Sequence, residues 1–144
     1  MRISVLAAAV FGSMLIGSTT VSGATYSCKI NSLDRIDWVP ETVFFTEKEG
    51  AETVHTLDNV TFTISKKSAV AKVLVNNAKR ITFKWRTPRY VNREQQNAIF
   101  SIKATYLRPK KLLILYVKPE GYHNDGTGRG PCVEVKMDLN IIWK

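Results

Sequence analysis

The chain has 144 residues, 44% of them hydrophobic, and carries 21 basic against 12 acidic residues, a formal net charge of +9. This length fits one domain with its own core and argues against a multidomain protein. Two cysteines and two histidines are too few to indicate a metal site, and the Gly-x-Ser-x-Gly, His-Glu-x-x-His and Cys-x-x-Cys motifs are absent from the sequence. We therefore expect a protein that is not an enzyme and that uses neither a metal nor a cofactor.

The first 24 residues have the organisation of a cleaved secretory signal. Arg2 supplies the positive charge, residues 3–16 are almost all apolar, and small residues dominate from 17 to 24. An apolar segment of about 14 residues is shorter than the roughly 20 that span a bilayer, which argues against a membrane anchor. We predict cleavage behind Ala24 and export to the periplasm or the medium.

Cys28 and Cys132 are the two cysteines, and they lie near the two ends of the predicted exported chain. In an oxidising compartment a disulfide between them is the expected state, and it would close a single β domain over residues 25–144. The alternatives are two free thiols, a metal pair or a catalytic thiol. The last two would need further ligands or protection from oxidation.

Apolar residues after Ala24 mostly recur at every second position, which is typical of strands with one buried face. This pattern predicts strands at 26–30, 60–64, 81–85, 100–106 and 133–137, with a turn at 57–59. Residues 112–117 are apolar at both parities, which indicates a strand covered on both sides or one whose second face meets a loop or a partner.

Residues 69–75 are ambiguous, because Ser68 could cap a short helix whereas three valines favour a strand, which we prefer. About eight strands in this length predict an all-β fold, either a small antiparallel barrel of the lipocalin-like or calycin-like kind or a β-sandwich. A barrel leaves no open sheet edge and is our first choice.

Positive charge is concentrated in the middle of the chain. Residues 59–119 carry fourteen basic residues and a single acid, Glu94, whereas residues 25–58 and 120–144 are acidic overall. Without Arg2 the chain retains a net charge of +8. A field of this kind attracts polyanions, although a merely solvated basic surface would show the same composition.

The segment 79–93 has six basic residues, three aromatic rings and no acid before Glu94. If Ile81, Phe83 and Trp85 face the core, the residues between them form an outward basic row, with Lys103 on a neighbouring strand. Such a row can hold phosphate groups through charge-assisted hydrogen bonds. The basic residues that we expect to bind an anionic ligand are Lys79, Arg80, Lys84, Arg86, Arg89, Arg93, Lys103, Arg108, Lys110 and Lys111.

Residues 119–131 form a predicted loop with four glycines. The spacing Gly126-x-Gly128-x-Gly130 lacks the lysine and the following helix of a phosphate-binding P-loop, so a backbone nest for an anion around Gly128 and Arg129 and a purely structural crossover both stay open. The loop also contributes two further candidate ligand-binding residues, Tyr122 and His123. A catalytic alternative is a phosphodiesterase that uses His55 and His123, provided that the fold brings the two imidazoles together.

Several short motifs resemble a group of small uncharacterised exported proteins of alphaproteobacteria. They are Trp38-Val-Pro-Glu41, Ala71-Lys-Val73, Lys79-Arg-Ile-Thr-Phe-Lys-Trp85, Gln96-Asn-Ala98, Pro119-Glu-Gly-Tyr122-His-Asn124 and Gly130-Pro-Cys132. The resemblance covers most of the chain behind the signal. It implies a periplasmic or secreted bacterial protein, and it implies no activity, cofactor or catalytic residue.

We therefore expect an exported, non-catalytic protein that binds anionic polysaccharide, lipopolysaccharide or a membrane surface through its basic face. A structural, partner-binding or inhibitor-like role is the alternative, although a lysozyme-inhibiting barrel at +8 would be repelled by a cationic enzyme unless residues 25–58 made the contact. Specific nucleic-acid binding is disfavoured, because Tyr90 is the one aromatic of the basic segment outside the inward parity. The sequence does not decide the oligomeric state.

Overall fold

The computed structural model describes residues 23–34, 36–137 and 139, so the predicted secretory signal lies almost wholly outside the described residues. In chain order the elements are β1 (Ala24–Lys29), β2 (Asn31–Ser32), β3 (Thr42–Glu47), β4 (Thr53–Asp58), α1 (Asn59–Ser65), β5 (Ala69–Asn76), β6 (Arg80–Arg86), β7 (Tyr90–Val91), β8 (Asn97–Ala98), β9 (Phe100–Leu107), β10 (Leu112–Pro119) and β11 (Gly126–Val135).

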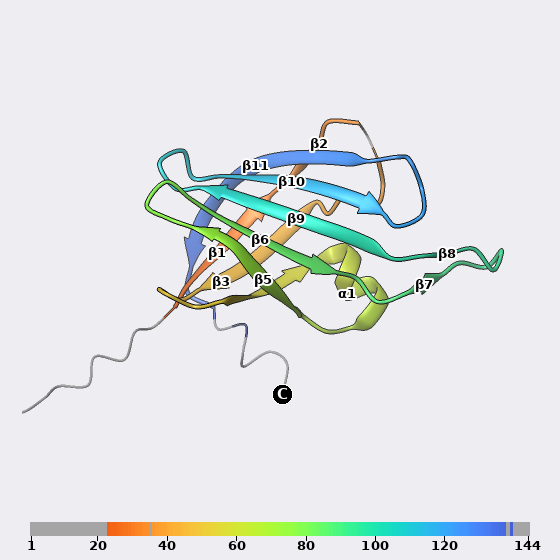
Figure 1. Ribbon diagram of the computed structural model, residues 1–144, viewed down its shortest axis with the longest axis horizontal. Helices are drawn as coiled ribbons and strands as arrows, with labels where there is room; N and C mark the ends of the chain where they lie inside the picture. Colours follow the sequence, from red (N-terminus) through yellow and green to blue (C-terminus); the bar gives the residue numbers. More distant parts are fainter. Residues whose placement is uncertain (1–22, 35, 138, 140–144) are drawn as a thin grey trace, which may run out of the picture.

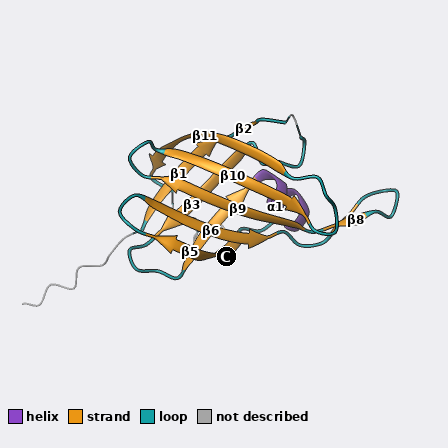
Figure 2. Ribbon diagram, turned by 45° about the horizontal axis from the view of Figure 1, so that its top comes forward, coloured by secondary structure: helices purple, strands orange, loops and turns teal. Residues whose placement is uncertain are grey.

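Eight of these strands form a closed antiparallel barrel, in the order β1, β3, β4, β5, β6, β9, β10 and β11. Each long strand pairs with the next one along the chain, and β11 returns to pair with β1 (Figure 1). The short β2 adds to β11, and β7 pairs with β8 in a hairpin that projects from one end of the barrel (Figure 2). The barrel predicted from the sequence is confirmed, and the closed sheet excludes the sandwich.

Aromatic side chains fill the interior of the barrel. The ring of Tyr26 lies 5.0 Å from those of Phe45 and Tyr106, and Phe45 lies 5.1 Å from Phe83, which stacks in turn on Trp85. Barrels of eight strands have an interior just wide enough for side chains. A ligand of this protein is therefore expected on the outer surface or at the ends of the barrel rather than among these rings.

The predicted disulfide between Cys28 and Cys132 is confirmed. The two residues are direct partners in the antiparallel pair of β1 and β11, which is the pair that closes the barrel. Both are buried in the core. The bond therefore covalently fixes the seam between the first and last strands.

The strand predicted at 60–64 and the turn predicted at 57–59 are wrong, because this region contains the end of β4 and the helix α1. The buried carboxylate of Asp58 caps the helix by accepting a hydrogen bond from the backbone N–H of Thr61 at 2.8 Å, and Lys66 ends it in the left-handed conformation. These caps satisfy backbone groups that a seven-residue helix cannot satisfy itself. Residues 69–76 form a strand, as preferred, with an irregular register between Val73 and Val75.

The glycine-rich segment is also different from the prediction, because β11 begins at Gly126 and leaves a loop of only six residues after Pro119. Gly126, Gly128 and Gly130 are all buried. A Cβ at Gly126 would lie 2.6 Å from Val39, and one at Gly130 would overlap the backbone of Lys29. The glycines thus let the segment that follows β1 pack closely against β11, and a phosphate nest at Gly128 is not present.

The outer face of β10 and β11 carries apolar side chains. Along β10, Leu113, Leu115 and Val117 are buried, whereas Ile114 and Tyr116 are 39% and 36% exposed. The second face of this strand is therefore open to solvent, since none of the described residues covers it. The strand predicted at 133–137 was expected to turn Val133 toward the core, and this is wrong. Val133 is 63% exposed, and the preceding residue, Cys132, is the buried one.

Candidate functional site

Three lysines line up across neighbouring strands on the outside of the barrel. Lys72 on β5 pairs with Lys84 on β6, and Lys84 pairs with Lys103 on β9. All three side chains are exposed, because the neighbouring residues along each strand point toward the core. We call this set the lysine row. Direct cross-strand partners have Cβ atoms about 5 Å apart, so the row is a compact line of positive charge.

A second basic line runs beside the lysine row. Arg86 on β6 and Lys118 on β10 both pair with Ser101 on β9, and both are exposed. Arg86 donates two hydrogen bonds of 2.6 Å to the carboxylate of Glu120. This bidentate bond lowers the pKa of Glu120, and the positive charge of Lys84 lowers it further. Because Glu120 already engages the Arg86 guanidinium, we define the basic face as the lysine row together with Lys118.

The lysine row ends at an aromatic side chain. Tyr116 on β10 is the cross-strand partner of Lys103, whose Nζ lies 5.6 Å from the ring centroid, within range of a cation–π interaction. The Tyr116 hydroxyl donates a hydrogen bond to Asp125, and this bond raises the pKa of Tyr116. The bond to Asp125 holds the Tyr116 ring beside Lys103 at this end of the row.

The sequence-predicted basic residues do not all gather on this face. Arg80, Lys84, Arg86 and Lys103 project from the outer surface of β6 and β9, as the outward parity of 80–86 predicted. Arg89 and Arg93 are exposed at the start of the projecting hairpin and in its turn. Lys79, Arg108, Lys110 and Lys111 lie at the other end of the barrel, in the turns that follow β5 and β9.

Arg108 has a structural role at that other end. Its Nη1 lies 2.5 Å from the Glu47 carboxylate, and its other nitrogens donate to Asn76 and to the backbone carbonyl of Asn77. The hydrogen bond to Glu47 raises the pKa of Arg108. With its donors already engaged by the protein, this guanidinium holds β3 to the turn after β5 and is removed from the candidate ligand set.

The loop candidates are also separated. Arg129 is exposed on β11 and pairs with Ile114, so it lies on the outer surface near the Tyr116 end of the lysine row. Tyr122 and His123 are exposed in the loop between β10 and β11. His55 lies on β4, and the strand order places β4 and β10 on opposite sides of the barrel. The two imidazoles therefore do not form the acid and base pair that a phosphodiesterase mechanism requires.

Asp58 is a buried carboxyl group at the start of α1. It accepts hydrogen bonds from the backbone N–H of Thr61 and, at 3.1 Å, from the indole N–H of Trp85. Burial raises the pKa of Asp58, although these hydrogen bonds oppose the shift. Because the carboxyl is enclosed by the helix it caps and by Trp85, its role is to join α1 to the barrel core.

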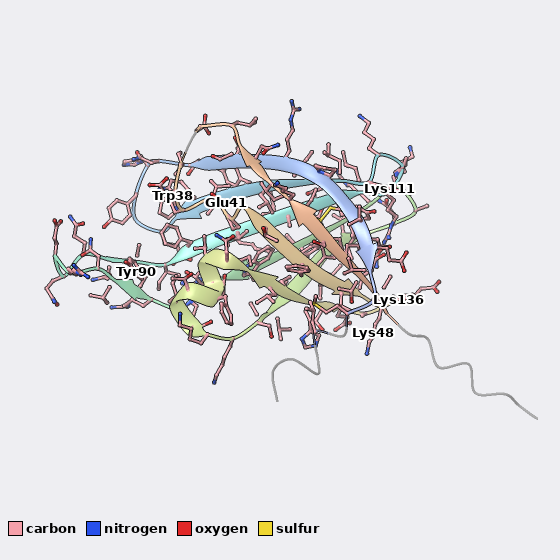
Figure 3. The ribbon with its side chains drawn as sticks, turned by 180° about the vertical axis from the view of Figure 1, so that it is seen from behind. Trp38, Glu41, Lys48, Tyr90, Lys111 and Lys136 are labelled. Atoms are coloured by element: carbon pink, nitrogen blue, oxygen red, sulfur yellow. A yellow bond between two sulfur atoms is a disulfide. The ribbon has the colours of Figure 1, made fainter. Side chains whose placement is uncertain are left out.

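A groove of about 350 Å³ opens at the end of the barrel that carries the β7–β8 hairpin. It is lined by residues from three distant parts of the chain, among them Trp38, Tyr90 and Tyr122. Trp38 and Tyr90 lie at the same end of the molecule, whereas Lys48, Lys111 and Lys136 lie at the other (Figure 3). The sequence showed Tyr90 as an exposed ring, but the groove depends on contacts that no local pattern reveals.

No protein-family model matches the chain, and neither a curated protein nor a solved structure is significantly similar to it. Within residues 23–34, 36–137 and 139, no three histidine, cysteine or carboxylate side chains come together as metal ligands. No helix of the described part is long and apolar enough to cross a membrane.

Proposed function

We propose that this is an exported, non-catalytic protein that binds anionic envelope polymers, such as lipopolysaccharide or acidic polysaccharide, through the basic face. The observation that carries the proposal is the direct pairing of Lys72, Lys84 and Lys103. Like charges directly opposite each other destabilise a sheet, so their alignment favours a role in binding. Repeated phosphate or carboxylate groups along a polymer are the ligand that a line of ammonium groups complements.

The signal-like first 24 residues and the disulfide of the closing seam support export to an oxidising compartment. Charge also supports the proposal, because the segment 59–119 that contains the whole basic face has a single acidic residue, and the neighbouring Glu120 is bonded to Arg86.

Retention on immobilised lipopolysaccharide and heparin under a rising salt gradient tests the proposal. The wild-type protein is compared with Lys84→Gln/Lys103→Gln and with Lys48→Gln/Lys136→Gln, which removes the same charge at an end of the barrel away from the Tyr90 hairpin (Figure 3). We expect Lys84→Gln/Lys103→Gln to elute at clearly lower salt than Lys48→Gln/Lys136→Gln. The first variant removes two of the lysines that contact the polymer, so less salt is needed to screen the remaining contacts. Equal elution of the two variants would show that only net charge matters and would refute the basic face.

A second candidate function is binding of a protein partner through the outer surface of β10 and β11. Ile114 and Val133 are exposed there, and Leu112 pairs with Pro131 beside them. Light scattering during size-exclusion chromatography tests self-association on this surface. A dimer that Ile114→Lys converts to a monomer supports the partner role, and a monomer at all concentrations argues against a second copy as the partner.

A further inference from the structure

The groove at the hairpin end of the barrel has the features of a small-molecule site. Its volume of about 350 Å³ falls at the lower end of the roughly 300–1,000 Å³ that such sites enclose. The segment before β3, the β7–β8 hairpin and the loop after β10 all contribute to it. It therefore exists only in the folded protein.

Aromatic rings form one part of the groove. Tyr90 and Tyr122 line it and are 44% and 50% exposed. Trp38 lines it too, and its ring is held by stacking on Phe100 with centroids 5.8 Å apart. Two accessible phenol rings and a fixed indole offer flat apolar surfaces to a ligand that has an apolar face of its own.

Carboxamide side chains form the other part. Asn92, Gln96, Asn97 and Asn124 line the groove. The Asn92 side chain is engaged in the hairpin turn, where it accepts from the backbone N–H groups of Glu94 and Gln96 and donates to the side-chain Oε1 of Gln96. Within the described part of the chain, the side-chain amides of Asn97 and Asn124 make no hydrogen bond. Each can both donate and accept, as hydroxyl groups do.

The lining contains no charged side chain, although the chain as a whole is at +9. A phosphate or carboxylate therefore has no counter-charge in the groove itself. The complementary ligand is an uncharged group with many hydroxyls and an apolar face, which describes a sugar ring. We propose that this groove binds a pyranose ring of a glycan, with its C–H face on Tyr90 or Tyr122 and its hydroxyls on Asn97 and Asn124.

An extended peptide fits the groove less well. Peptide recognition by strand addition needs a long sheet edge, and β7 and β8 have two residues each. The glycan site goes beyond the proposed function, because none of the residues that line it belongs to the basic face. The two sites can therefore succeed or fail separately.

Titration of the isotope-labelled protein with neutral tetrasaccharides, observed by NMR, tests the site. The probes are the β1,4-linked tetramer of N-acetylglucosamine and the α1,4- and β1,4-linked tetramers of glucose. We expect one of them to shift backbone signals of the hairpin and of residues 120–125, with a dissociation constant on the order of 1 mM. Tyr122→Ala is expected to weaken binding about fivefold, since it removes one stacking surface.

Leu74→Ala is the control, because Leu74 is an exposed apolar side chain on β5 that does not line the groove. It is expected to bind the sugar as the wild type does.

Tyr90→Ala and Asn124→Ala are the second variants if Tyr122→Ala has a lowered melting temperature. The proposal is overturned if none of the three tetrasaccharides shifts groove signals, if a folded Tyr122→Ala binds like the wild type, or if a proline-rich peptide binds there in place of the sugars. Loss of heparin retention in Lys84→Gln/Lys103→Gln with sugar shifts intact would separate the two proposals.

Discussion

Lys84 on β6 and Lys103 on β9 are direct cross-strand partners, and Lys72 on β5 extends the pair to a third strand. Two opposed ammonium groups in a sheet cost on the order of 0.2–1 kcal/mol relative to a neutral pair. Surface positions tolerate almost any residue, so nothing in the fold itself demands lysine at all three. We propose that the alignment exchanges some stability for the capacity to bind an anion.

This exchange makes opposite predictions for stability and for binding. Lys84→Gln removes the central charge of the row, so we expect the free energy of unfolding to rise by a few tenths of a kcal/mol while retention on lipopolysaccharide falls. Urea denaturation and the salt gradient measure the two effects. Lys48 lies outside the row, so Lys48→Gln should change the free energy of unfolding and the retention less than Lys84→Gln does. A Lys84→Gln protein that is both less stable and fully retained would contradict the prediction.

The Cys28–Cys132 disulfide closes a loop with a sequence separation of 104 residues. In the chain-entropy model, loss of such a bond destabilises the fold by about 4–5 kcal/mol, an upper value. We expect Cys28→Ser/Cys132→Ser to lower the urea midpoint strongly, and reduction of the wild type by dithiothreitol to give the same midpoint. A loss below about 1 kcal/mol would mean that strand pairing alone closes the barrel.

Gly130 lies against the backbone of Lys29, so a methyl group there has no space. We expect Gly130→Ala to destabilise the fold by about 3 kcal/mol or more, because backbone cannot yield as a flexible side chain can. Gly121→Ala is the control. Gly121 has a φ of +85° and nothing near its missing Cβ, so this change should cost only about 1 kcal/mol. Thermal unfolding of the two variants compares these costs, and equal losses would exclude the close approach as the cause.

Burial raises the pKa of Asp58 above its ordinary value of 3.8. The folded protein then binds a proton more tightly than the unfolded chain does, so this residue's contribution to stability is complete below 3.8 and is lost as the pH rises through the folded pKa. We expect the free energy of unfolding of the wild type, measured relative to Asp58→Asn, to fall as the pH is raised over that range. Asp37→Asn, an exposed and charge-matched control, should not reproduce the trend. A constant difference between wild type and Asp58→Asn would rule out the linkage.

The sequence predicted the strands whose side chains alternate between the barrel interior and the solvent. Residues 81–85 and 100–106 alternate because each second side chain enters the interior, and this parity also placed Lys84 and Lys103 on the outer surface. The addition of Lys72 to the row could not be predicted. It depends on the register of β5 against β6, which shifts between Val73 and Val75.

The failures have long-range causes. Val60, Phe62 and Ile64 alternate like a strand, yet the segment is a helix whose capping residue, Asp58, also binds Trp85. That contact joins residues 27 positions apart and leaves no trace in a local pattern. The alternation of Gly126, Gly128, Gly130 and Cys132 was in fact a strand signal with inward glycines, but the usual association of glycine with loops concealed it.

The seam between β1 and β11 also determines how the molecule would respond to force. A pull applied at the two ends of the chain first loads the strand pairs outside the disulfide, where residues 24–27 pair with β3 and residues 25–27 with 133–135. It then reaches Cys28 and Cys132, and the covalent bond passes the load from one to the other without loading the residues between them. Under oxidising conditions the part of the barrel between the two cysteines is therefore shielded from tension. Reduction would release a contour length of about 350 Å, since an extended residue spans about 3.4 Å. The redox state of one bond thus decides whether this protein behaves as a short tether or as a long extensible one.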